Sequence, residues 1–181
     1  QNVLENLSKR GVKTFNMAKN EDFQATNSRL TAFGALKTML SHANSAPDDL
    51  DVLVIGFGRT GCALARLLDD VNVKSLTIST NSSPRQARAF ADFIIPSSGF
   101  DFSPYDVVFN TAPEKIVTDK EILSFKPTAV YIDLASTPAL SLCFAKYIGI
   151  DADVYPALPA KVCPKSAAKA IADYIKNEVM I

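Results

Sequence analysis

The sequence predicts a three-layer α/β domain in which helices cover both faces of a doubly wound parallel sheet. From residue 51 onward, short apolar runs alternate with segments whose apolar residues recur at helical spacing. This is the pattern of parallel strands joined by crossover helices. The first apolar run ends in Gly56, Gly58 and Gly61, with the spacing G-x-G-x-x-G. Such a strand-to-helix turn is typical of a Rossmann fold, for which we expect the strand order 3-2-1-4-5-6.

The elements after residue 50 are predicted from these patterns. The run at 129–134 is almost continuously apolar, as in a strand buried on both faces, and Pro84 suits the first turn of a helix. The last helix is long and amphipathic. The predicted strands are 52–55, 76–79, 93–95, 107–109, 129–134 and one that ends at Val154. The predicted helices are 60–68, 84–91, 119–123, 139–147 and 165–179.

The first 50 residues follow a different pattern. Helical spacing covers residues 3–10 and 26–42, residues 12–15 could form one short strand, and residues 41–49 are a polar turn. These elements bury little by themselves, and the first residue is Gln rather than Met. We therefore expect residues 1–26 to be the remnant of a truncated N-terminal domain, 27–50 a connecting helix and linker, and 51–181 the dinucleotide-binding domain.

Composition narrows the classes of function. Apolar residues make up 48% of the 181 residues, and 19 Lys and Arg balance 19 Asp and Glu. A neutral chain without a basic block is a poor candidate for binding nucleic acid or an anionic membrane. No apolar run has the length of a membrane span, no signal peptide is recognisable, and the three cysteines are widely spaced. We expect a cytoplasmic protein without a metal site.

Each glycine of the first turn has a physical role. Gly56 permits the tight turn, Gly58 lets the backbone approach a pyrophosphate, and Gly61 lets the helix pack closely on the strand. Free N–H groups at the helix N-terminus then face the phosphate charge. Thr60 lies in the same loop, and Arg59 either runs along the phosphates or is a solvated residue of the first turn.

The segment after the second strand indicates which dinucleotide binds. An NAD site usually has an acidic residue there, bonded to the ribose 2′-hydroxyl. This chain has no carboxylate but a polar segment with nearby arginines, Arg85 and Arg88, that suits a 2′-phosphate. We predict NADP, bound by Asn81, Ser82, Ser83 and Arg85. The alternative is that these polar residues only cap the next helix.

Polar residues also follow the fourth and fifth strands. Asn110, Thr111 and Pro113 would line the cofactor, and Asp133 and Ser136 would reach its nicotinamide end. An alternative for Asp133 is a carboxyl group that caps a nearby turn. The only histidine, His42, lies in the predicted linker, so a proton would have to move through Lys, Asp, Ser or a residue of another domain.

Three segments together with VIGFGRTG resemble the dipicolinate synthase A-subunit family. They are FNTAP at 109–113, IDLASTP at 132–138 and PALPAKVCPKSAA at 156–168. The resemblance implies a Rossmann domain preceded by another domain. It also implies an NADP-dependent dehydrogenase that oxidises a dihydrodipicolinate-type precursor to the aromatic dicarboxylate during sporulation. It further leads us to expect a homo-oligomer and a flavoprotein-like second subunit.

The chain departs from the family pattern at several positions. Thr137 stands in place of an arginine suited to a substrate carboxylate, and Ala157, Ala160 and Ala168 stand in place of glycines. The alternatives are therefore a shikimate-dehydrogenase-like or hydroxyacid oxidoreductase, or a non-catalytic NADP-binding subunit.

The proline-rich loop at 156–166 is the predicted substrate site. It ends at a helix N-terminus, where Lys165 could pair with a small dicarboxylate or donate a proton. We predict that substrate carboxylates approach the amide groups of Lys165 and Ser166. The alternatives are that Lys165 is an exposed helix lysine and that the loop only packs the last helix against the sheet.

Overall fold

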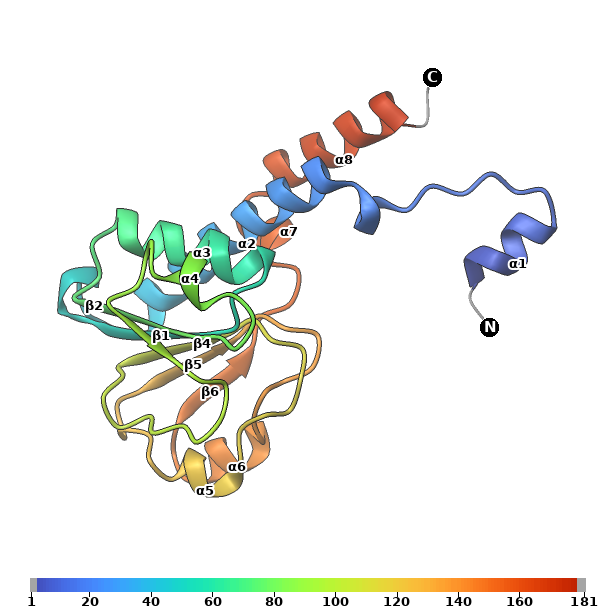
Figure 1. Cartoon of the computed structure of the whole chain (residues 1–181). Helices are drawn as coiled ribbons and strands as arrows, with labels where there is room; N and C mark the ends of the chain where they lie inside the picture. Colours follow the sequence, from blue (N-terminus) through green and yellow to red (C-terminus); the bar gives the residue numbers. More distant parts are fainter. Residues whose placement is uncertain (1–2, 179–181) are drawn as a thin grey trace.

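A six-stranded, all-parallel sheet forms the centre of the computed structural model, which describes residues 3–178 (Figure 1). The strand order is β3-β2-β1-β4-β5-β6, so the predicted order is confirmed. The central strand β1 pairs with β2 through Asp51 and Ser75 and with β4 through Val52 and Val107. The strands are β1 (Asp51–Ile55), β2 (Ser75–Ser79), β3 (Phe93–Ile95), β4 (Val107–Asn110), β5 (Val130–Asp133) and β6 (Asp151–Val154).

Helices cover both faces of the sheet and make the fold three-layered (Figure 1). Residues 52–55 of β1 are fully buried, and their side chains alternate between two cores, with Val54 in one and Ile55 in the other. The first core is closed by α2 (Glu21–His42), α3 (Arg59–Asp70), α4 (Pro84–Ala87) and α7 (Leu158–Val162). The second is closed by α5 (Asp119–Ile122) and α6 (Leu142–Tyr147).

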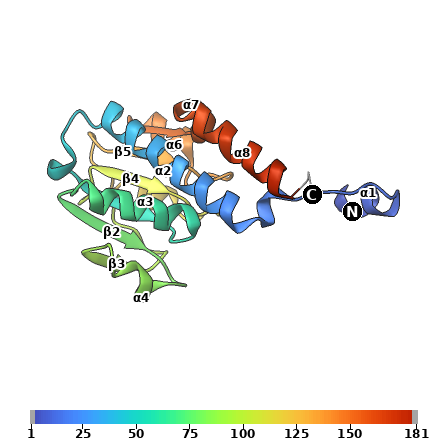
Figure 2. The same ribbon diagram turned by 90° about the horizontal axis from the view of Figure 1, so that it is seen from above.

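Helices α2 and α8 (Pro164–Glu178) extend side by side beyond the edge of the sheet (Figures 1 and 2). The rings of Phe23 and Tyr174 lie 6.1 Å apart, and Asn20 Nδ2 donates to Glu178 Oε1 at 3.2 Å. The short helix α1 (Val3–Lys9) lies away from the sheet in both views. Two 3₁₀ turns, Met17–Lys19 and Pro47–Asp49, flank α2.

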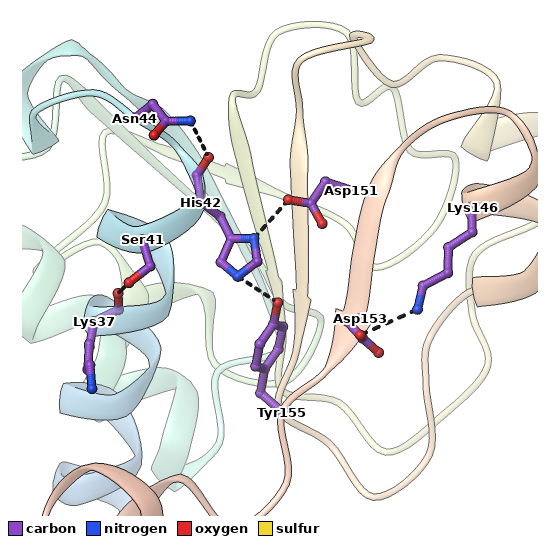
Figure 3. Close-up of polar contacts among 8 residues, drawn as sticks. All are labelled: Lys37, Ser41, His42, Asn44, Lys146, Asp151, Asp153 and Tyr155. Atoms are coloured by element: carbon purple, nitrogen blue, oxygen red, sulfur yellow. Dashed lines mark hydrogen bonds and ion pairs between the residues drawn. The ribbon is translucent and has the colours of Figure 1, made fainter.

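The C-terminal end of α2 is fixed to strand β6 by His42 (Figure 3). His42 Nδ1 lies 2.8 Å from Asp151 Oδ2, and the hydroxyl of Tyr155 lies 3.1 Å from His42 Nε2. Burial, and then the charges of Asp151 and Asp153, raise the pKa of Tyr155. The hydroxyl therefore stays protonated and can donate to the imidazole. His42, which the sequence places between the two predicted domains, thus holds the end of α2 against the strand β6 and Tyr155.

Several predicted boundaries were wrong for identifiable reasons. Residues 12–15 form no strand, because no neighbouring strand pairs with them. Helix α2 begins five residues earlier than predicted, at a cap in which Asn20 Oδ1 accepts from the Phe23 N–H. The division of the chain at residue 26 stays a prediction, although α2 runs through that position.

Three helices also differ from their predictions. Helix α4 ends at Ala87 rather than at residue 91. Helix α6 begins at Leu142 rather than at residue 139, because the Ala139 N–H donates to the Asp133 side chain. Helix α7 was not predicted. The predicted last residue of the C-terminal helix, 179, lies outside the described residues.

Among residues 3–178, no helix is long and apolar enough to cross a membrane. The three cysteines are free thiols.

Candidate dinucleotide-binding site

The glycine loop between β1 and α3 has the geometry that its spacing predicts. Gly56 has φ +92°, a left-handed backbone that glycine adopts without strain. A Cβ atom on Gly61 would lie 2.2 Å from the Gly56 carbonyl oxygen, so only glycine lets the helix approach the loop this closely. A Cβ atom on Gly58 would have no heavy atom within 4 Å. The space in front of Gly58 is therefore open to a ligand.

The N-terminus of α3 faces this open space. Gly58 is its N-cap and provides no side-chain cap, and the first hydrogen bond within the helix runs from the Cys62 N–H to the Gly58 carbonyl at 2.8 Å. The N–H groups of Arg59, Thr60 and Gly61 therefore have no acceptor within the helix. An uncapped, glycine-lined helix N-terminus fits a pyrophosphate group.

The Arg59 side chain is exposed but paired. Its guanidinium forms a two-pronged ion pair with Glu21 in the first turn of α2, with Nη2–Oε1 and Nε–Oε2 distances of 2.5 and 3.1 Å. Both side chains remain largely exposed. Glu21 was missed from the sequence, since nothing in the local pattern links two residues that are 38 positions apart.

The loop after β2 lies beside the glycine loop, because the Gly56 N–H donates to the Ser79 carbonyl at 2.9 Å. Asn81 Oδ1 accepts from the Ser97 N–H at 3.0 Å, which leaves the Asn81 amide nitrogen for a ligand. Ser83 is the N-cap of α4 but makes no side-chain cap bond. The capping alternative is therefore not realised at Ser83. Ser82 and Arg85 are exposed.

A buried polar cluster lies where β4 and β5 end. Asn110 and Asp133 are both 0% exposed, and Asn110 Nδ2 donates to Asp133 Oδ2 at 3.0 Å. Asp133 also accepts from the Tyr131 hydroxyl and from the N–H groups of Ala135 and Ala139. Burial, and then the neighbouring Asp133, raise the pKa of Tyr131, so its hydroxyl keeps the donated proton.

This cluster changes what Asn110 and Asp133 can do. Both polar atoms of the Asn110 amide are bonded, since Oδ1 accepts from the Ala112 N–H and Nδ2 also donates to the Ala112 carbonyl. Asp133 has no exposed atom. The geometry does not support direct contact of Asp133 with a substrate and favours the alternative of a carboxyl group that holds a turn. The partner Tyr131 was missed, although its position two residues before Asp133 puts both side chains on one face of β5.

Thr111 contacts the backbone at the start of the glycine loop. Its hydroxyl lies 3.0 Å from the Ile55 carbonyl oxygen and 3.2 Å from that of Gly56. A Cβ atom on Gly56 would lie 2.6 Å from this hydroxyl. Thr111 thus fixes the loop, and Pro113, further along, is exposed.

The residues predicted to bind substrate, Ser136, Lys165 and Ser166, are exposed. Ser136 lies in the turn after β5, and Lys165 in the first turn of α8. A cleft of about 390 Å³ between α2 and α8 is lined by Ser166 together with Arg29 and Lys169, but not by Lys165. The structure therefore brings the glycine loop, Asn110, Thr111 and Asp133 together and leaves Lys165 outside this cluster.

The fold and the glycine loop define the class of protein, a doubly wound domain of the type that binds dinucleotides in dehydrogenases. A D-lactate dehydrogenase from Lactobacillus jensenii, solved with NAD+, shares this fold with a TM-score of 0.64 at 10% identity, over 99% of this chain and 71% of its own. No protein-family model matches the chain.

Closer similarity is found to one particular protein. The chain is 27% identical, over 98% of its length, to the A subunit of dipicolinate synthase from Bacillus subtilis (strain 168). Crystal structures of the same protein from Bacillus halodurans and Bacillus subtilis superpose with TM-scores of 0.88 and 0.86, at 24% and 25% identity over 98% of this chain. The resemblance to the dipicolinate synthase A-subunit family is thus confirmed. The chain spans about 60% of the length of these relatives (60%, 62% and 61%).

Proposed function

We propose that this chain is the NADP-binding part of an oxidoreductase related to the A subunit of dipicolinate synthase. The observation that carries the proposal is the uncapped N-terminus of α3 behind Gly58, where a Cβ atom would meet nothing. The D-lactate dehydrogenase solved with NAD+ supports a nicotinamide dinucleotide as the ligand. When bound, such a cofactor accepts or supplies a hydride at its nicotinamide ring.

Two loops of the chain would bind the cofactor, the glycine loop after β1 and the loop after β2. The N–H groups of Arg59, Thr60 and Gly61 would hold the pyrophosphate. Around the ribose, the free amide of Asn81, the hydroxyls of Ser82 and Ser83, and the guanidinium of Arg85 would take the 2′-phosphate. The buried bonds of Asn110, Thr111 and Asp133 would keep these loops in position.

For the reaction, we propose the oxidation of a dihydrodipicolinate-type dicarboxylate in the cytoplasm, as the family resemblance implies. Ser136 and Lys165 are the exposed polar residues proposed to meet the substrate. Asp133, which is fully buried, would act by positioning the turn that carries Ser136. Self-association and a second, flavoprotein-like subunit belong to the same proposal.

The preference for NADP can be tested by replacing Ser82 with Asp, which puts a negative charge beside the proposed 2′-phosphate. The unaltered chain should bind NADPH at least about tenfold more tightly than NADH, the value of one good charged contact. Ser82→Asp should remove this preference by weakening NADPH alone. Ser103→Asp, at an exposed serine in the turn between β3 and β4, is the matched control. Equal affinity of the unaltered chain for NADPH and NADH would exclude the NADP assignment.

A non-catalytic NADP-binding subunit is the second candidate. The burial of Asp133 favours this candidate, because Asp133 cannot reach a substrate. Of the proposed catalytic residues, only Ser136 and Lys165 are then accessible. The protein would then bind NADPH but fail to reduce NADP+ with any dihydrodipicolinate-type, hydroxyacid or shikimate substrate. Turnover with one of these substrates that is lost in Lys165→Met, with NADPH binding intact, would instead support the enzyme.

A further inference from the structure

The ion pair between Glu21 and Arg59 lies directly at the proposed phosphate site. Arg59 is the first residue of α3, immediately after Gly58, so its own N–H is one of the groups that face a bound pyrophosphate. Its guanidinium, however, is occupied by the Glu21 carboxylate through two short contacts. A carboxylate and a phosphate can each accept two parallel hydrogen bonds from one arginine through a pair of oxygen atoms. They would therefore compete for the same edge of the Arg59 side chain.

The pair is placed so that it can be exchanged. The two side chains are 57% and 72% exposed, and exposed ion pairs contribute little to stability because water screens them. Glu21 is not needed to cap α2, since Asn20 Oδ1 already accepts the Phe23 N–H at 2.8 Å. The start of α2 is also held on α8 through Asn20 and Glu178. Breaking the contact with Arg59 thus leaves the cap and the α8 contact of α2 intact.

We infer that Glu21 is an internal competitor of the cofactor phosphate for Arg59 and sets the affinity of the site. This inference rests on the proposed dinucleotide site. With the pair formed, the charge of Arg59 is neutralised and the edge of its guanidinium is occupied by Glu21. When the cofactor binds, its pyrophosphate replaces Glu21 on the guanidinium. Glu21 thus lowers cofactor affinity, although it lies on a helix outside the glycine loop.

The test is a titration with NADPH, followed by its fluorescence, for single and double variants of the chain. Glu21→Gln keeps the size of the side chain and removes the charge. It should tighten NADPH binding about fivefold, because the attraction to Glu21 that the cofactor must displace from Arg59 is that of two unit charges about 4 Å apart in water. Asp22→Asn removes the same charge from the next residue, which is also exposed. It should change affinity less than about twofold.

The pairing with Arg59 is tested by a double-mutant cycle. Arg59→Ala should weaken NADPH binding, and in that background Glu21→Gln should have almost no effect. The inference is overturned if Glu21→Gln leaves NADPH affinity unchanged, if it has the same effect in the Arg59→Ala background, or if Arg59→Ala binds NADPH as tightly as the unaltered chain. In these cases NADPH still binds the unaltered chain. A chain that binds neither NADPH nor NADH would overturn the proposed site and this inference with it.

Discussion

Asn110 and Asp133 are register partners on β4 and β5, and their side chains meet in the interior with Nδ2 and Oδ2 3.0 Å apart. The pair lies at the point where both strands end and where the chain turns into the loops of the candidate site. Asp133 accepts four hydrogen bonds there, three of them at Oδ2. The two side chains therefore lock the ends of two strands and the turn from 134 to 139.

Replacing Asp133 with Asn should lower the free energy of unfolding by about 2 kcal/mol. In Asp133, Oδ1 accepts from Ala135, and Oδ2 accepts from Asn110, Tyr131 and Ala139. Asparagine has an amide nitrogen in place of one of these oxygens, so at least one donor would lose its acceptor. For a domain of this size the melting temperature should fall by about 4–8 °C. Denaturant unfolding measures the change.

Asp153→Asn on the neighbouring strand β6 is the control for this prediction. Its side chain is exposed, so the loss of charge should cost no more than about 1 kcal/mol. Equal destabilisation by the two variants would show that the buried cluster has no special role.

Ala157 adopts a left-handed backbone, with φ +59°, at the N-cap of α7. The resemblance leads us to expect glycine at this position, and the methyl group of alanine is strained in a left-handed backbone. Ala157→Gly should therefore stabilise the fold by about 1 kcal/mol. Ala160→Gly, within α7, should instead destabilise it by about 1 kcal/mol. Thermal unfolding of both variants checks this opposite sign, and a loss of stability in Ala157→Gly would contradict it.

Asp106 should make stability depend on pH in the acid range. Burial alone would raise its pKa, but hydrogen bonds from Lys126 Nζ, at 2.7 Å, and from the Asp51 N–H outweigh it and lower the pKa below 3.8. A carboxyl group with a lowered pKa in the folded state stabilises the fold fully above its unfolded pKa. This stabilisation is lost as the pH falls through the lowered value.

The measurement is the free energy of unfolding of the unaltered chain and of Asp106→Asn at about pH 6 and about pH 3, on either side of the ordinary carboxyl pKa. The unaltered chain should be more stable at the higher pH, and the gap between the two proteins should narrow at the lower one. A gap of the same size at both pH values would mean that the pKa of Asp106 is not lowered.

The sheet was predictable because its strands are buried on both faces. The side chains of residues 52–55 alternate between two cores, so all four are apolar. The strand can therefore be recognised from its own sequence, without knowing which strands pair with it. The order of the strands followed from the glycine loop, because this strand-to-helix turn is typical of a Rossmann fold. Helix α7 was missed because Pro156 and Pro159 suggest a stiff loop, whereas Pro159 fits the first turn of a helix.

The site was less predictable because its contacts are long-range. Gly56, Gly58 and Gly61 indicate their roles through spacing alone. No local pattern shows that Glu21 reaches Arg59 or that Asp133 is enclosed by four donors. Ala160 and Ala168 lie within helices α7 and α8, where alanine is favourable, so the backbone at these two positions does not require glycine.

The central claim is that a dinucleotide lies against Gly58, and Gly58→Ala tests it most directly. The added methyl group meets no atom of the protein, so it causes no clash. Alanine is a poorer N-cap than glycine, and this alone should lower the melting temperature by no more than about 3 °C. The methyl would occupy the place of the pyrophosphate, and NADPH binding should weaken at least about tenfold. If Gly58→Ala binds NADPH as tightly as the unaltered chain, the cofactor does not lie against this loop.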